Sequence, residues 1–216
     1  MNSYPKINSI FKRDKAGKLI WGDFSCPEFA YLANNTWRMD EKLDGMNIRC
    51  LWYSHPLIEE LEIRGRTDKA RLDNDLVTKI KSLISINKLK EIFPVGEERP
   101  DVCLYGEGLS HKINKGGKYF PEGKGYDFVL FDIKIGQWYL KREDIEEIAL
   151  KLGIKIAPIF GYGTLYDVIN AIKHGIKSSF GNFLAEGLVL RPAVDLRSRS
   201  GGRIISKVKH RDFGIG

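Results

Sequence analysis

The residues best suited to chemistry in this chain are Lys42-Leu43-Asp44-Gly45, with Asn47 two positions later. A lysine amine is a nucleophile only without its proton, and its usual pKa of about 10.4 keeps it charged at neutral pH. Desolvation or a nearby cation releases that proton. The same four letters also fit a strand that ends in an ordinary Asp-Gly turn with a solvated lysine. The remainder of the chain has to distinguish these two interpretations.

Acidic and basic residues elsewhere favour the chemical interpretation. Asp44, Glu107 and Glu186 each lie beside a glycine at the predicted end of an apolar strand. A single acid in such a place is usually a turn residue, but together the three offer the oxygen ligands that Mg²⁺ or Mn²⁺ prefers. Lys207 and Lys209 are two residues apart in a predicted strand, so their side chains point the same way. The alternative for this lysine pair is a solvated strand face.

Hydrophobic periodicity predicts the elements that must position these residues. A short strand or hairpin is expected within residues 1–20 and a helical turn or two near 27–32. Residues 41–53 are typical of a strand, a turn and a second strand, and 57–66 of its antiparallel partner. Further strands are expected at 102–107, 126–135, 154–160, 185–191 and 203–209, with helices at 73–93, 143–152 and 164–174. Because strands and helices do not alternate regularly, the fold class expected is α+β with two mainly antiparallel sheets flanked by helices.

Composition limits the classes of protein to which the chain can belong. The formal charge of +7 and the pI of about 9.2 favour a polyanionic partner, and no acid occurs within residues 197–211. The three cysteines form no Cys-x-x-Cys pair and the four histidines are scattered, so neither disulfides nor zinc are expected. No apolar run approaches the roughly 20 residues of a membrane span, and no signal peptide is evident. We therefore expect a cytoplasmic monomer without membrane contact.

Six short motifs in order give the chain a family resemblance. They lie at residues 42–45, 64–68, 105–108, 128–132, 185–191 and 206–209. In this order they resemble the covalent nucleotidyltransferases, the superfamily of polynucleotide ligases and RNA capping enzymes. Asn47, the Gly-Arg-Thr-Asp segment and the final Lys-x-Lys-x-x-x-Phe are most similar to the small phage-type ATP-dependent RNA ligases. The resemblance implies one nucleotidyltransferase (ATP-grasp-like) domain over residues 1–216, with no room for the C-terminal OB-fold that many relatives carry.

The resemblance also implies a role for individual residues. Lys42 would attack the α-phosphate of ATP to form lysyl-N-AMP, and a divalent metal and Lys207 would favour its neutral amine by charge repulsion. Lys207 and Lys209 would offset the charge that develops on the phosphate. The residues assigned to nucleotide binding are Glu41, Asn47, Arg66, Glu107, Phe131 and Glu186, and those assigned to the metal, Mg²⁺ or Mn²⁺, are Asp44, Glu107 and Glu186.

Some of these assignments are more detailed. Phe131 matches the position that stacks on adenine, and strand alternation puts Phe128 on the opposite face. Arg66 matches the arginine that contacts ribose or phosphate, with Arg64 as the second choice. Asn47 is expected to bind the AMP phosphate, and Glu107 the ribose hydroxyl.

The reaction implied is the joining of 5′-phosphate and 3′-hydroxyl RNA ends through lysyl-N-AMP and an adenylylated 5′ end. The partners expected are RNA ends, with a nicked duplex or an RNA/DNA hybrid as candidate forms. The basic segments 112–124 and 197–203 are candidate contacts to the RNA backbone. The alternatives are a minimal ATP-dependent DNA ligase, a GTP-dependent RNA guanylyltransferase, and a basic RNA-binding protein that is not an enzyme.

Overall fold

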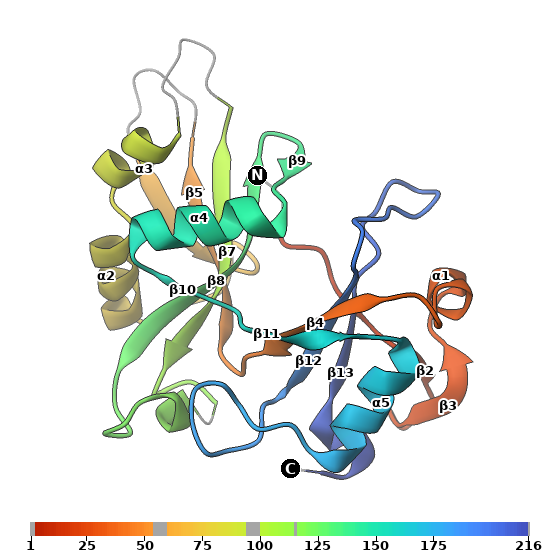
Figure 1. Cartoon of the computed structure of the whole chain (residues 1–216). Coiled ribbons are helices and arrows are strands. Elements are labelled where there is room, and N and C mark those ends of the chain that lie inside the picture. The colour runs from red at the N-terminus through yellow and green to blue at the C-terminus, as the bar shows by residue number, and fades with distance from the viewer. Residues whose placement is uncertain (1–2, 54–59, 94–99, 115, 216) are drawn as a thin grey trace. The chain divides into compact units, whose positions relative to one another are not determined.

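The computed structural model describes residues 3–53, 60–93, 100–114 and 116–215, which form two compact units (Figure 1). Unit 1 comprises Met1–Pro5 and Asp44–Ala157, and unit 2 comprises Lys6–Leu43 and Pro158–Gly216. The strands are β1 (Asn8–Ser9), β2 (Phe11–Arg13), β3 (Leu19–Phe24), β4 (Trp37–Lys42), β5 (Met46–Trp52), β6 (Leu61–Gly65), β7 (Val102–Ser110), β8 (Tyr126–Ile135), β9 (Trp138–Tyr139), β10 (Lys155–Ile156), β11 (Ile159–Gly163), β12 (Gly187–Pro192) and β13 (Ser206–Lys209). The helices are α1 (Pro27–Tyr31), α2 (Asn74–Leu83), α3 (Ile86–Ile92), α4 (Arg142–Leu152) and α5 (Leu165–His174), with short 3₁₀ turns η1 (Gly116–Tyr119) and η2 (His210–Phe213).

Unit 1 is a sheet with helices on one face. Its strand order is β10-β8-β7-β5-β6, with β9 paired to β8, and only the β10–β8 pair is parallel among the strands described. The apolar face packs against α2, α3 and α4 in a core that includes Ile48, Leu104 and Phe128. Because strand side chains alternate, the opposite face carries polar residues of the same strands, among them Asn47, Arg49 and Glu107.

Unit 2 has the same design on a smaller sheet. Its strand order is β1-β13-β12-β4-β11, and β1 is its one parallel strand in the described structure. The apolar face, with Trp37, Leu188 and Val208, shares a core with residues of α5. A separate β2–β3 hairpin and α1 complete this unit. The predicted α+β class with two mainly antiparallel sheets flanked by helices is therefore confirmed.

Three predicted elements need correction or refinement. The helix expected over residues 73–93 is two helices, because the backbone is extended at Ile84 and the Ser85 side chain caps α3. The strand expected at 154–160 is also two, β10 in unit 1 and β11 in unit 2, interrupted at Ala157 and Pro158. The strand-turn-strand over 41–53 is confirmed as β4 and β5, but these strands belong to different sheets, because the chain leaves unit 2 after Leu43.

Other local predictions agree with the structure. The N-terminal hairpin, the helical turn near residue 27 and the strands at 102–107, 126–135, 185–191 and 203–209 are all present, with ends that shift by a few residues. Thr164 caps α5 and Gly153 ends α4 in the left-handed region, as their residue types indicate. Part of the predicted strand at 57–66 and the expected stop at Pro94 lie outside the described residues. Among the described helices, none has the length and apolar character that crossing a membrane requires.

Candidate active site

Three neighbouring strands of unit 2 bring Lys42, Glu186 and Lys209 together. In the ladder, Gly187 of β12 lies opposite Lys42 of β4 on one side and opposite Lys209 of β13 on the other. Residues that oppose one another in a sheet share a face, so both lysine side chains emerge on the polar face beside Glu186. Residues 144 positions apart in the sequence thus become direct neighbours.

The carboxylate of Glu186 forms an ion pair with both lysines. Lys42 Nζ lies 2.6 Å from Glu186 Oε2, and Lys209 Nζ donates to Glu186 Oε1. Burial by itself raises the pKa of Glu186, but the charge of Lys42 and the hydrogen bonds from both lysines outweigh it and hold that pKa below its usual value. The charged contact of the Lys42 side chain is therefore the Glu186 carboxylate, which it shares with Lys209.

Gly187 allows the strands to approach closely enough for this cluster. A Cβ at this position would collide with the backbone carbonyl oxygen of Val208. A side chain would therefore separate β12 from β13 and move Lys209 away from Glu186. Close packing of β12 against β13 thus requires the glycine at position 187, and the ion pairs with the two lysines require the acid at position 186.

Lys207 emerges one row further along the same face. Lys207 opposes Val189, and Val189 opposes Asp40 of β4. Lys207 is partly exposed between the buried residues Ser206 and Val208, as expected for a strand with one solvent-accessible face. The prediction that Lys207 and Lys209 point the same way is confirmed.

His210 supports the backbone of this cluster and was not identified from the sequence. Its Nε2 accepts a hydrogen bond from the Ile176 N–H at 2.9 Å, so its Nδ1 carries the proton that is donated to the Ala185 carbonyl at 2.7 Å. The His210 N–H donates to the Glu186 carbonyl at 3.1 Å. A fully buried histidine with one fixed tautomer therefore holds the backbone on both sides of the Glu186 side chain. Its place next to the Lys-x-Lys strand was the only available signal in the sequence.

Glu41 occupies the core side of β4, opposite to Lys42. Its carboxylate accepts hydrogen bonds from the Ser178 hydroxyl at 2.5 Å and the Ser179 N–H at 2.8 Å, and the residue is 5 % exposed. Both carboxylate oxygens are thus engaged by the loop before β12. Its assignment to nucleotide binding stays a prediction, and the structure adds that the side chain fixes this loop.

In unit 1 the Asp44-Gly45 turn is held by hydrogen bonds. The Asp44 N–H donates to the Tyr119 hydroxyl at 2.9 Å, and the Gly45 N–H donates to Glu107 Oε1 at 3.0 Å. Asn114 Nδ2 lies 3.2 Å from Asp44 Oδ1, which orients that carboxylate. Two of the predicted metal ligands, Asp44 and Glu107, are therefore tied to one turn.

Asn47 lies next to this turn and opposes Glu107 in the β5–β7 ladder. Its Oδ1 is buried and has no hydrogen-bond partner in the part of the chain that the structure describes. An unpaired buried acceptor costs about 1–3 kcal/mol, so such groups are rare without a functional reason. The orphaned oxygen fits a ligand that brings a donor to it, such as a hydroxyl or a metal-bound water, and the amide can also turn to present its N–H₂ to a phosphate.

Phe131 is the extra residue of a β-bulge in β8. The register shifts here, so that Leu130 opposes Gly106 while Asp132 opposes Tyr105. Phe128 is fully buried in the helix-covered core, whereas Phe131 is only partly buried. The predicted difference between these two phenylalanines is therefore confirmed.

Tyr4 supports this aromatic residue from within unit 1. Its ring meets that of Phe131 at 5.1 Å between centroids, and its hydroxyl donates to Asp132 Oδ2 at 2.7 Å. Tyr4 was not selected by the sequence analysis, because an isolated aromatic residue near a terminus carries no motif.

The arginines near β6 differ in how they are engaged. Arg64 forms ion pairs with Glu62 and Asp68, at 2.7 and 3.2 Å. Arg66 is exposed and forms no ion pair among the residues described, which leaves it available to a ligand and favours it over Arg64.

Buried Arg49 was missed, although it shares a face with Asn47. It donates to the Gly65 carbonyl at 2.9 Å and to Asp68 at 2.6 Å, so it orders the segment that carries Arg66. The hydrogen bond from Arg49, followed by that from Arg64, lowers the pKa of Asp68. The signal that could have identified it is the polar and apolar alternation of β5.

Within the described residues, no three acidic, histidine or cysteine side chains converge on one point. Of the three predicted metal ligands, Asp44 and Glu107 belong to unit 1, whereas Glu186 belongs to unit 2 and is paired with lysines there. The oxygen-rich set of Asp44, Glu107 and the orphaned Asn47 Oδ1 nevertheless fits Mg²⁺ or Mn²⁺. Mg²⁺ commonly keeps several waters and needs only one or two carboxylates.

Comparison with known protein families identifies the family of this chain. The sequence model of the RNA ligase family matches residues 35–209, which contain all of the motifs described above. The chain therefore belongs to the RNA ligase family. No curated protein matches the sequence in a direct comparison.

Solved structures of Naegleria gruberi RNA ligase share the fold. A variant with ATP and Mn has a TM-score of 0.64 and 19% sequence identity to this chain. The alignment covers 97% of this chain and 58% of the Naegleria chain. A second variant with ATP and Mn has a TM-score of 0.64 and 20% sequence identity, and the alignment covers 98% of this chain and 60% of the Naegleria chain. An apo variant has a TM-score of 0.64 and 18% sequence identity, and the alignment covers 99% of this chain and 59% of the Naegleria chain. This chain thus spans about three fifths of the length of these relatives, and the nucleotidyltransferase fold of RNA ligases is the feature that they share.

Proposed function

We propose that this protein is an ATP-dependent RNA ligase that joins 5′-phosphate and 3′-hydroxyl RNA ends through lysyl-N-AMP. The observation that carries the proposal is the cluster of Lys42, Glu186 and Lys209 on the polar face of unit 2, built from three family motifs that are far apart in the sequence. A solvated lysine after a strand would not need a second lysine and a shared, partly buried carboxylate. We also propose that residues 1–216 make up one nucleotidyltransferase domain.

In the first step Lys42 Nζ forms a bond to the α-phosphorus of ATP, and the bond to the pyrophosphate oxygen breaks. The amine must first leave its contact with Glu186 and lose its proton. Lys209 competes for the same carboxylate and can retain it when Lys42 withdraws. Lys209 and Lys207 then lie on the face where negative charge develops on the phosphate oxygens, which they offset.

The residues of unit 1 are assigned to nucleotide recognition. Phe131 would stack on adenine, Glu107 would accept from a ribose hydroxyl, and Asn47 would use its unpaired amide on the phosphate or on a metal-bound water. Arg66 would contact ribose or phosphate. Asp44 and Glu107 would hold the divalent cation, which supplies charge stabilisation for the phosphate when bound, whereas Glu186, the third predicted ligand, is engaged by Lys209.

Two further steps follow from the family chemistry. The AMP group moves from Lys42 to the 5′-phosphate of an RNA end, and the 3′-hydroxyl of the other end then displaces AMP as the phosphodiester bond forms. Nicked duplexes and RNA/DNA hybrids are candidate substrates, and we infer a monomer that acts in the cytoplasm.

Of the two basic segments that sequence analysis assigned to RNA, 112–124 is the weaker candidate. Its Lys112 is engaged by Asp73 and Asp75 at 3.2 and 3.1 Å, so part of its charge is already balanced.

The test is adduct formation with labelled nucleotides. The protein is incubated with α-labelled ATP or GTP and Mg²⁺, and label on the protein is measured after denaturation. Lys42→Arg is the sharpest control, because a guanidinium keeps the charge next to Glu186 but stays protonated and cannot attack. We expect an adduct with ATP for the wild type and none for Lys42→Arg or Lys42→Ala.

Other outcomes distinguish the alternatives. An adduct with GTP alone would favour a guanylyltransferase, and no adduct with either nucleotide would contradict the enzyme proposal. Nicked substrates with DNA or RNA on the 3′-hydroxyl side then separate an RNA ligase from a DNA ligase, since only RNA carries the 2′-hydroxyl.

A further inference from the structure

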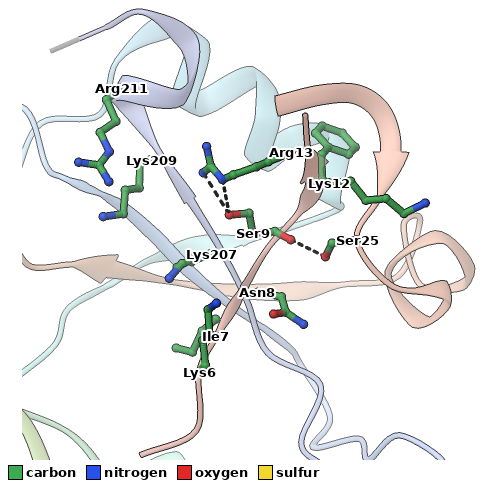
Figure 2. A pocket seen from close by; sticks show the side chains of 11 residues that line it. Lys6, Ile7, Asn8, Ser9, Lys12, Arg13, Ser25, Lys207, Lys209 and Arg211 are labelled. Atoms are coloured by element: carbon green, nitrogen blue, oxygen red, sulfur yellow. Dashed lines mark hydrogen bonds between the residues drawn. The ribbon is translucent and has the colours of Figure 1, made fainter. Parts of the chain in front are cut away.

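Unit 2 contains a basic pocket of about 530 Å³ that sequence analysis did not anticipate (Figure 2). Eleven residues line it, and none of those described is acidic. Six are lysines or arginines: Lys6, Lys12, Arg13, Lys207, Lys209 and Arg211. The N-terminal members of this set belong to residues 1–20, for which the sequence predicted only a short strand or hairpin.

Parallel pairing of β1 with β13 builds the pocket. Ser9 lies opposite Lys207, and the Ile10 N–H donates to the Lys207 carbonyl at 3.1 Å. Alternate residues of an extended strand lie roughly 7 Å apart on one face, which separates Lys207 from Lys209 by that interval. Arg211 follows in η2, and Figure 2 shows the three side chains in succession beside the segment that carries Lys6, Ser9 and Arg13.

The pocket keeps a positive charge after its ion pairs are considered. Lys12 pairs with Asp23 at 2.8 Å, Arg13 pairs with Asp212 at 2.8 Å, and Lys209 pairs with Glu186. Lys6 and Arg211 are exposed, and no carboxylate of the described chain forms an ion pair with either. A concave surface lined by one sign of charge concentrates an anionic ligand.

The neutral residues of the lining indicate which part of a nucleic acid would bind. Ser9, Ser25 and Asn8 supply hydroxyl and amide groups, which commonly contact phosphates. Phe11 is the one aromatic residue in the described lining, and it is 3 % exposed because its ring packs against Trp21 and Phe24. Without an available ring on which a base could stack, the pocket fits a sugar-phosphate backbone and not bases.

We propose that this pocket binds the phosphodiester backbone of an RNA strand next to its reacting end, without regard to base sequence. This inference rests on the proposed ligase function. Lys209 belongs both to the pocket and to the cluster with Glu186 and Lys42. An RNA strand held in the pocket would therefore have its phosphates next to the cluster that contains the reacting lysine. Lys6 and Arg211 are binding residues for the strand and take no part in forming the adduct.

The test measures RNA affinity against salt concentration. Fluorescence anisotropy of a labelled, 5′-phosphorylated single-stranded RNA is followed with the full chain, its Lys6→Ala/Arg211→Ala variant and a control. The control is Lys79→Ala/Lys81→Ala, which removes the same charge from exposed positions of α2 in unit 1. For two lost phosphate contacts we expect affinity at about 0.1 M salt to fall roughly 20-fold and the slope of log K against log[salt] to decrease by about 1.4.

The control should bind as the wild type does, and a uridine homopolymer should lose as much affinity as a mixed sequence. The rate of lysyl-AMP formation should be unchanged in both variants.

RNA affinity and salt slope equal to those of the wild type would overturn the proposal. A raised KM for ATP with unchanged RNA affinity would also overturn it, because the pocket would then hold the phosphates of the nucleotide. RNA binding through Lys6 and Arg211 in a protein that forms no adduct would support the pocket and contradict the ligase activity.

Discussion

The polar faces of the two sheets carry different chemistry on the same architecture. In unit 2 the face presents charges in mutual contact, with Glu186 shared between Lys42 and Lys209. In unit 1 it presents hydrogen-bond acceptors around a turn, with Glu107 held by the Gly45 N–H and Asn47 Oδ1 left unpaired. Under the proposed function, this difference corresponds to a division of labour, in which unit 2 would make and break the covalent bond and unit 1 would recognise the nucleotide.

The largest effect should come from a charge in unit 2. In the proposed reaction, Lys209→Ala would remove a cation from the face where the phosphate reacts, and loss of one such group typically costs about 10²–10³-fold in rate. We expect adduct formation to slow by about 10²-fold in single-turnover assays with ATP. Lys177→Ala, which removes an exposed lysine of the same unit, should react at the wild-type rate. Equal rates for the two variants would remove Lys209 from the chemistry.

A smaller effect, of a different kind, should follow from changes in unit 1. Asn47→Ala removes a buried acceptor that has no described partner, so the free protein should lose no stability and can gain up to about 1 kcal/mol. The same change should raise the KM for ATP about tenfold, because a hydrogen bond to a charged group contributes about 1.5–3 kcal/mol. Urea denaturation and adduct kinetics measure the two quantities. A large loss of stability without a change in KM would mean that Asn47 is structural.

The smallest effect should be on stability and should depend on pH. The folded-state pKa of Glu186 lies below its usual value, so its ionised form stabilises the fold above that usual value and the contribution is lost as the pH falls through the folded pKa. Glu186→Gln should therefore be less stable than the wild type at neutral pH, with a difference that shrinks below about pH 4.5. Urea denaturation between about pH 3 and about pH 7 measures this difference. A difference that is constant with pH would show that the ion pairs do not contribute.

Local patterns predicted most of the fold. Alternation identified β5, apolar runs identified β7 and β8, and cap residues such as Thr164 identified helix ends, because these signals lie within a few residues. The division of residues 73–93 was not evident, because Leu83, Ile84 and Leu89 continue the apolar period across the break at Ser85. Which sheet a strand joins is also not a local property, so β4 and β5 looked like consecutive strands of one sheet.

The candidate site shows the same limit. Motif order identified Lys42, Glu186 and Lys209, and strand parity gave the shared direction of Lys207 and Lys209. Contacts between distant segments could not be predicted, because nothing near Lys42 specifies Glu186 as its partner. For the same reason the sequence did not indicate that Ser178 would engage Glu41, or that β1 would bring basic residues beside β13.

Peptide mapping by mass spectrometry after incubation with ATP and Mg²⁺ tests the central claim most directly. The account predicts one AMP group per chain, attached to the peptide that contains Lys42, and none on the peptides that contain Lys207 or Lys209. It also predicts that pyrophosphate removes the group, since the first step is reversible. AMP on Lys207 or Lys209 with Lys42 unmodified, or no AMP on any lysine, would contradict it.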